Sequence, residues 1–361
     1  MPYSYQSGAI ERQWLQASHD TLVRSRNGFC FYAANEKLLK RDILPWLNFS
    51  QDAFLPHRQA VCLREPTEDE RPALSRFEGT ARAEWIEPLH GIPRHPLFTI
   101  GKKHSFTASH GCRFPSSLPR ASLFDIRYLI LADHCCSASS SSGRLGQHLF
   151  FDLGTSEYGG AAGVVDGRMR NFEGVFGSRA SIPLFIELYR QRCVTFDHIF
   201  AFEAAAMSHR QFWHGVPPSL RAKIRLYNTP VVEPVSEDGG TRNATAAAAA
   251  SLPYHVSSVL ALLLETARPA DFVVLKVDID GGPELRLVRA IAERPELAAL
   301  VDELFFEYHF RAPNRMFDEL WGSEKMAGGV PSVKEGGSTV VDALALMLKL
   351  RRRGVRAHFW V

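Results

Sequence analysis

Two aspartates separated by one residue follow an apolar run in the second half of the chain. Residues 273–284 read VVLKVDIDGGPE, so that Asp278 and Asp280 come directly before a pair of glycines. A strand that stops at acids and glycines brings carboxylates to the edge of a sheet, where ligands bind. Such a pair suits three chemistries: phosphoryl transfer through an aspartyl nucleophile, binding of a divalent metal, or contact with an organic cofactor and its substrate.

Two more predicted strands also end in groups that contact ligands. Residues 148–160 read HLFFDLGTSEYGG, in which Asp152 and Gly154 stand at the end of an apolar run. Residues 196–203 read FDHIFAFE and end in Glu203. Glycine allows a tight turn close to a ligand, and a carboxylate accepts both hydrogen bonds of vicinal ribose hydroxyls. The sequence Gly-x-Gly-x-x-Gly is not satisfied after the first strand.

The elements that position these groups alternate along the chain. Short apolar runs predict strands, and apolar residues at helical spacing predict helices between them. The strands are expected at 148–152, 196–203, 223–232, 273–277, 303–310 and 355–360, and the helices at 178–191, 256–267, 285–291 and 340–353. This order predicts a doubly wound, Rossmann-like α/β fold with a mostly parallel sheet.

The first part of the chain follows a different pattern. Residues 1–143 are irregular and rich in proline, with one convincing strand at 125–131, and they end in the low-complexity stretch CCSASSSSG. A second such stretch, 241–251, is expected to be an inserted loop. We therefore predict an N-terminal extension over 1–143, which either shapes the choice of acceptor or packs on the sheet edge, and a Rossmann-like domain over 144–361.

The rest of the chain discriminates among the three chemistries. Phosphoryl transfer of the haloacid dehalogenase kind needs a later lysine and a closely spaced acidic pair, but the aspartates after Glu284 are isolated. A glycosyltransferase would use Asp278-Ile279-Asp280 to bind a metal, although that leaves Asp152, Gly154 and Glu203 unexplained. The glycosyltransferase stays open as an alternative function, as does a binding protein without catalytic activity.

The third chemistry accounts for all these segments. The run KVDIDG at 276–281 resembles the Lys-Ile-Asp-Val-Glu-Gly signature of the FkbM family of S-adenosylmethionine-dependent methyltransferases. DLG at 152–154 resembles the family's first motif, and FE at 202–203 its ribose-binding strand end. YNTPV at 227–231 is similar to the third strand with its asparagine, and FFE at 305–307 to the fifth. The resemblance covers a few strand ends between about 147 and 361.

This resemblance implies S-adenosyl-L-methionine as cofactor and a methyltransferase fold. Its cofactor-binding residues would be Asp152, Gly154, Glu203, Asn228 and Asp278. The sequence departs from the family because Asp280 replaces a glutamate and Glu284 stands one position late. The fold of the family also ends in an antiparallel pair of strands, whereas one terminal strand is evident here.

The candidate catalytic residues are Asp280, Glu307 and His309. Asp280 is a general base or the N-cap of the helix after it, and the two interpretations are equally good. Glu307 and His309 are two apart on a predicted strand and therefore share a face. We predict no metal, and transfer of a methyl group to a hydroxyl of a small molecule or sugar.

Bulk properties exclude several function classes. Lysine and arginine number 42 against 39 acids, a net charge of +3, so no overall field attracts nucleic acid or membranes. No apolar segment is long enough to span a membrane, and the polar start MPYSYQSGAIERQ lacks the pattern of a secretory signal. The six cysteines form no Cys-x-x-Cys pair. We expect a cytoplasmic protein.

Overall fold

The computed structural model of the protein describes part of the chain. The described residues are 86, 89, 129, 131–132, 146–155, 158, 164–165, 168–169, 181–190, 192–204, 208–229, 231–232, 254–279, 282–307 and 340–360. They contain the candidate residues Asp152, Gly154, Glu203, Asn228, Asp278 and Glu307. Asp280 and His309 lie outside them.

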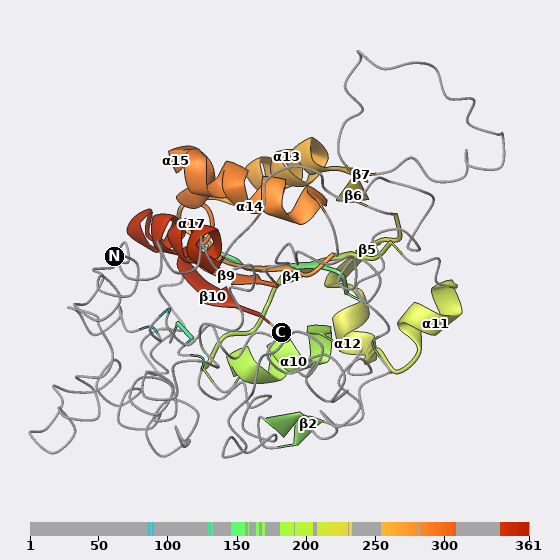
Figure 1. The fold of residues 1–361 in the computed structure, drawn as a ribbon. Helices are drawn as coiled ribbons and strands as arrows, with labels where there is room; N and C mark the ends of the chain where they lie inside the picture. The colour runs from blue at the N-terminus through green and yellow to red at the C-terminus, as the bar shows by residue number, and fades with distance from the viewer. Residues whose placement is uncertain are drawn as a thin grey trace, which may run out of the picture.

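A six-stranded sheet forms the centre of the described structure (Figure 1). Its order is β10-β9-β8-β1-β4-β5, and every neighbouring pair is parallel. The strands are β1 (His148–Leu153), β4 (His198–Phe202), β5 (Ile224–Tyr227), β8 (Phe272–Val277), β9 (Glu303–Phe306) and β10 (Arg356–Phe359). The chain first builds outward from β1 to β5 and then returns to β8 on the other side, so the strand order reverses between β1 and β8.

Helices cover both faces of this sheet (Figure 1). One face carries α13 (Val256–Thr266), α14 (Gly282–Glu293), α15 (Pro295–Ala298) and α17 (Val340–Arg352), and the other carries α10 (Ser181–Arg190) and α12 (Pro218–Arg221). The short α11 (His209–Trp213) follows β4. Because the sheet is covered on both sides, alternate side chains of its strands enter two separate apolar cores.

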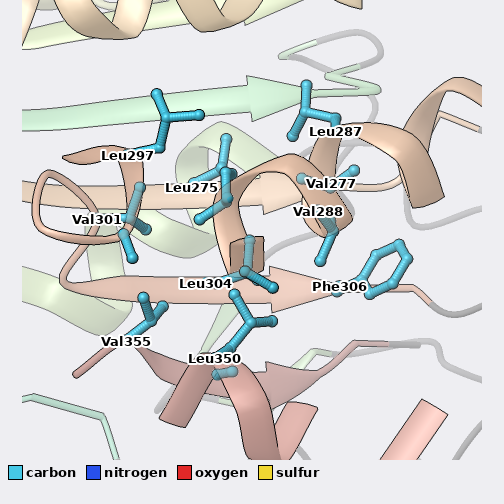
Figure 2. Packing of buried hydrophobic residues seen from close by; sticks show 14 of the residues in the cluster. Leu275, Val277, Leu287, Val288, Leu297, Val301, Leu304, Phe306, Leu350 and Val355 are labelled. Carbon is cyan, nitrogen blue, oxygen red and sulfur yellow. The ribbon is translucent and has the colours of Figure 1, made fainter. Parts of the chain in front are cut away.

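The two cores divide neighbouring residues of one strand between them. Leu275 and Val277 pack with Leu287 and Val288 of α14, as Figure 2 shows. Val274 of the same strand packs on the opposite face, with α10. Because side chains alternate along a strand, Lys276 lies on the same face of the sheet as Val274. Its charged side chain is therefore buried on the side covered by α10.

The structure confirms an α/β fold with a parallel sheet and corrects the ends of the third and fifth strands. The third strand ends at Tyr227, and β6 (Val231–Val232) pairs instead with β7 (Tyr254–His255). The fifth strand ends at Phe306, so Glu307 follows it. The last strand, β10, is parallel to β9 and directly beside it, so no antiparallel strand separates them. The four residues of β10 are buried although the strand lies at the end of the sheet.

The N-terminal extension contributes to both cores. Ile86 and Leu89 belong to the core that contains α14, whereas Leu129 and Leu131 belong to the one that contains α10. Leu129 and Leu131 are not in a strand, and the remainder of the predicted strand 125–131 lies outside the described residues. The boundary at residue 143 stays a prediction, but these contacts make Ile86, Leu89, Leu129 and Leu131 part of the folded core.

A buried carboxylate fastens this extension to the sheet. The Ala132 N–H donates to Glu303 Oε1 at 2.9 Å and to Oε2 at 3.2 Å. The hydroxyl of Tyr189 donates to Glu303 Oε2 at 2.7 Å, and His358 Nε2 lies 2.8 Å from Oε1. Burial tends to raise the pKa of Glu303, but the hydrogen bond and charge of His358 and the nearby Arg356 outweigh it and leave that pKa lowered.

Cellular location stays a prediction. The helices that the structure describes include none with the length and apolarity to cross a membrane. Cys193, in the turn after α10, is disulfide-bonded, and such bonds are uncommon in the cytosol. The remaining five cysteines lie outside the described residues.

Truncating Leu131 tests whether the extension is part of the core. Leu131→Ala should lower the free energy of unfolding by about 2–5 kcal/mol, because it leaves a cavity in the core beneath α10. Leu264→Ala is the matched control, since that side chain is 43% exposed on α13. Urea unfolding measures both. Equal, small losses would show that the extension packs loosely.

Asp302 makes stability depend on pH. Burial raises the pKa of Asp302 from 3.8 to about 7, against the effect of the Val273 N–H that donates to its carboxylate. The folded protein therefore holds a proton that the unfolded chain releases, and Asp302 lowers stability as pH rises from about 4 to about 7. Relative to Asp302→Asn, the wild type should lose a few kcal/mol across that range. Urea unfolding at several pH values measures the difference, and parallel pH profiles would contradict the prediction.

Candidate functional site

Five candidate residues form one row at the carboxyl edge of the sheet. Each is the first residue after its strand, and the order across the sheet is Asn228, Glu203, Gly154, Asp278 and Glu307. Backbone bonds extend the ladder to this row, from Glu203 N to Tyr227 O at 3.1 Å, from Asp278 N to Leu153 O at 3.1 Å, and from Glu307 N to Val277 O at 3.0 Å. The expected meeting of these strand ends at one edge is therefore correct.

The turn after β1 lies at the centre of this row. Gly154 has a φ of +86°, a left-handed conformation that other residues rarely adopt. Its N–H donates to Phe202 O at 2.9 Å, and a Cβ on it would lie 1.7 Å from the carbonyl oxygen of Asp278. Glycine is needed here both for its conformation and because the backbones of β1 and β8 approach so closely.

Asp152 lies one layer below the edge. Its side chain is fully buried, on the same face as Lys276, with which it is in register. The Ser181 hydroxyl, in the first turn of α10, donates to Asp152 Oδ2. Lys276 Nζ lies 3.4 Å from Asp152 Oδ1. These contacts favour an indirect role for Asp152, and its predicted contact with a cofactor stays a prediction.

Lys276 connects the buried Asp152 to the residues at the carboxyl edge of the sheet. Its ammonium lies 2.9 Å from Asp278 Oδ2 and donates to the carbonyl oxygen of Gly154 at 3.1 Å. Burial alone would lower the pKa of Lys276, but the carboxylates of Asp278 and Asp152 outweigh it and raise that pKa well above its usual value. The lysine is therefore a permanent buried cation.

On the other side of the Gly154 turn, Asn228 supports Glu203. The Asn228 amide donates to the main-chain carbonyl of Glu203 at 3.0 Å. Both side chains are half-buried. Thr155, next to Gly154, is buried, and its hydroxyl oxygen has no hydrogen-bond partner within the described structure. An unsatisfied buried hydroxyl beside the strand ends is a group that a ligand can satisfy.

Of the three candidate catalytic residues, the structure describes Glu307 alone. It is buried beside Asp278, and its negative charge contributes to the raised pKa of Lys276. Since β9 ends at Phe306, Glu307 lies directly after the strand and not within it as expected. The described residues contain no group of three or more acids, histidines or cysteines that could hold a metal.

Sequence reasoning missed Lys276 and Ser181 as parts of the site. Lys276 had a visible signal, since a lysine inside the apolar run VVLKV must find an anionic partner when the strand is buried. The Asp152 partner depends on the strand register, and Ser181 stands 29 residues from Asp152 in the chain. Neither follows from sequence spacing.

Comparison with known proteins does not assign the chain to a family. No protein-family model matches the chain, and neither the curated proteins nor the solved structures include a match to it. The resemblance to the FkbM family therefore depends on the strand-end motifs alone, and the function must be argued from the site.

Substitution of Gly154 tests the geometry of the turn. Gly154→Ala should destabilise the protein by several kcal/mol, because the methyl group would strike the Asp278 carbonyl as well as strain the backbone. Gly215→Ala is the control, since that exposed glycine also has a positive φ, of 79°, and should cost about 1–2 kcal/mol. Thermal unfolding compares the two variants. Equal losses would rule out the close approach of β1 and β8.

Proposed function

We propose that this protein is a methyltransferase that uses S-adenosyl-L-methionine and transfers its methyl group to a hydroxyl of a small molecule or sugar. One observation carries the proposal: Glu203 and Asp278 flank the Gly154 turn at the point where the strand order reverses. In open α/β sheets, ligands bind in the crevice at this point.

The spacing of these groups suits an extended nucleoside ligand. Glu203 and Asp278 follow strands on either side of β1, so their main chains are two strand spacings apart, about 10 Å. In the proposed complex the Glu203 carboxylate accepts hydrogen bonds from the ribose hydroxyls. The tail of the ligand crosses Gly154 toward Asp278, and Thr155 supplies its unsatisfied hydroxyl beside this path.

The chemistry expected of the chain itself is modest. When bound, S-adenosylmethionine supplies an activated methyl group, and the protein mainly aligns the acceptor with it. For a hydroxyl acceptor, a carboxylate within reach removes the proton. Glu307 is buried beside Asp278 and is the candidate base among the described residues. The roles of Asp280 and His309 remain predictions.

One observation favours a second candidate ligand, a dinucleotide. The strand order with β10 parallel to β9 is the order of dinucleotide-binding domains, in which an acid after the second strand also binds ribose. Such domains use Gly-x-Gly-x-x-Gly to bring the backbone close to the pyrophosphate, and this chain has only Gly154 at the corresponding turn. We therefore place S-adenosylmethionine first.

A metal-dependent glycosyltransferase and a binding protein without catalytic activity have less support. The glycosyltransferase would need Asp278 as a metal ligand, but Lys276 Nζ lies 2.9 Å from Asp278 Oδ2, and its positive charge disfavours a second cation there. The binding protein would use the same groups around Gly154. Binding and turnover measurements separate it from the enzyme.

Glu203 provides the test of the proposal. The purified protein should bind S-adenosylmethionine and S-adenosylhomocysteine in calorimetry, and Glu203→Ala should weaken binding by roughly 1–3 kcal/mol through loss of charge-assisted hydrogen bonds. Glu265→Ala, which removes an exposed carboxylate on α13, should bind normally.

The same titration with NAD discriminates the second candidate ligand. If neither S-adenosylmethionine nor S-adenosylhomocysteine binds at millimolar concentration, the methyltransferase proposal is refuted. Tight binding of NAD would instead support the dinucleotide as the ligand. Unchanged affinity in Glu203→Ala would show that the ribose lies elsewhere.

A further inference from the structure

Lys276 is buried among apolar side chains, and its ammonium is closely surrounded by acceptors. The ammonium has three hydrogens. It faces three acceptors: Asp278 Oδ2 at 2.9 Å, the Gly154 carbonyl at 3.1 Å and Asp152 Oδ1 at 3.4 Å. The side chain is 2% exposed, so solvent does not compete for these contacts.

The two carboxylates beside this ammonium differ in their surroundings. Asp152 is fully buried and accepts a hydrogen bond from Ser181 of α10, so it is fixed from two sides. The side chain of Asp278 is 29% exposed at the edge of the sheet. The ammonium therefore has an inner, immobile partner and an outer partner that a ligand can reach.

The carbonyl of Gly154 adds a third constraint. The same ammonium binds the turn after β1 and the carboxylate after β8, the two sides of the point where the strand order reverses. Loss of the ammonium would remove one contact from each of them at once, while leaving Glu203 and Asn228 on the far side of the turn in place.

We propose that Lys276 is a positioning residue of this site: anchored by Asp152 and Ser181, its ammonium holds the Asp278 carboxylate in the orientation that recognises the tail of the ligand beyond the nucleoside. This inference rests on the proposed function for the identity of the ligand. Lys276 itself does not touch the ligand.

The test removes the buried cation together with its fully buried partner, Asp152. In the double variant Asp152→Asn/Lys276→Met both charges of the inner pair are gone, and Ser181 can still donate to the amide oxygen. Lys349→Met is the control, because it makes the same substitution at an exposed lysine of α17. Circular dichroism and thermal unfolding verify that each variant is folded.

The affinities for two probes discriminate positioning from general damage. The double variant should bind S-adenosylhomocysteine at least about tenfold more weakly than the wild type, the scale of one lost charge-assisted hydrogen bond. It should bind adenosine, which lacks the amino-acid tail, within about twofold. The positioning role would be overturned if the double variant and the wild type bound S-adenosylhomocysteine with equal affinity. It would also be overturned if the double variant lost the same factor in affinity for both probes.

A crystal structure of the double variant without ligand tests the same role independently. The Asp278 carboxylate should turn away from its wild-type position while the Glu203 main chain stays in place. An unmoved Asp278 would overturn the inference even if the wild type binds S-adenosylhomocysteine. Conversely, a wild type that binds neither probe refutes the proposed function, and the position of Asp278 then tests Lys276 on its own.

Discussion

The buried ammonium of Lys276 constrains how the strands can pair near the carboxyl edge of this sheet. The cost of removing a charge from water is large, and it is offset only when the charge is closely paired. Lys276 meets this requirement with one carboxylate below it and one above it. The central strands must therefore keep their register, because a slip of one residue would move Lys276 to the other face, into the apolar core of α14.

The same pairing also ties α10 to the sheet. Its first residue, Ser181, donates to Asp152, so the helix is tied to the central strand by a polar bond as well as by apolar packing. The polar bond fixes the position of the helix along the strand, which apolar contacts alone specify less sharply. Gly154 completes the arrangement, since its close approach to Asp278 fixes the distance between the two strands at the edge.

Much of the sheet follows from apolar runs, and the residues at the strand ends follow with it. Glu203, Asp278 and Gly154 could be predicted because each directly follows such a run, and parallel strands bring their carboxyl ends together. The direction of the last strand could not, because an apolar run has no signature for parallel or antiparallel pairing. The ends of the third and fifth strands were also missed: apolar residues such as Val231 and Val232 continue past the point where the ladder stops.

Long-range polar partners were beyond the reach of sequence reasoning. The contact of Glu303 with His358 spans 55 positions, and its bond from Ala132 spans 171. Each depends on the order in which strands lie side by side, which the sequence does not encode locally. Part of the candidate site remains a prediction for a different reason, since Asp280 and His309 lie outside the described residues.

The burial of β10 has a consequence for how this protein meets others. A terminal strand usually presents a row of open amide and carbonyl groups, and these invite a strand from another molecule to join the sheet. Here Arg356, Ala357, His358 and Phe359 are all buried, so that side of the sheet is closed to such an addition. At the other end of the described sheet, β5 is only partly buried, so a strand that extends this sheet would join it there, next to the asparagine that supports Glu203.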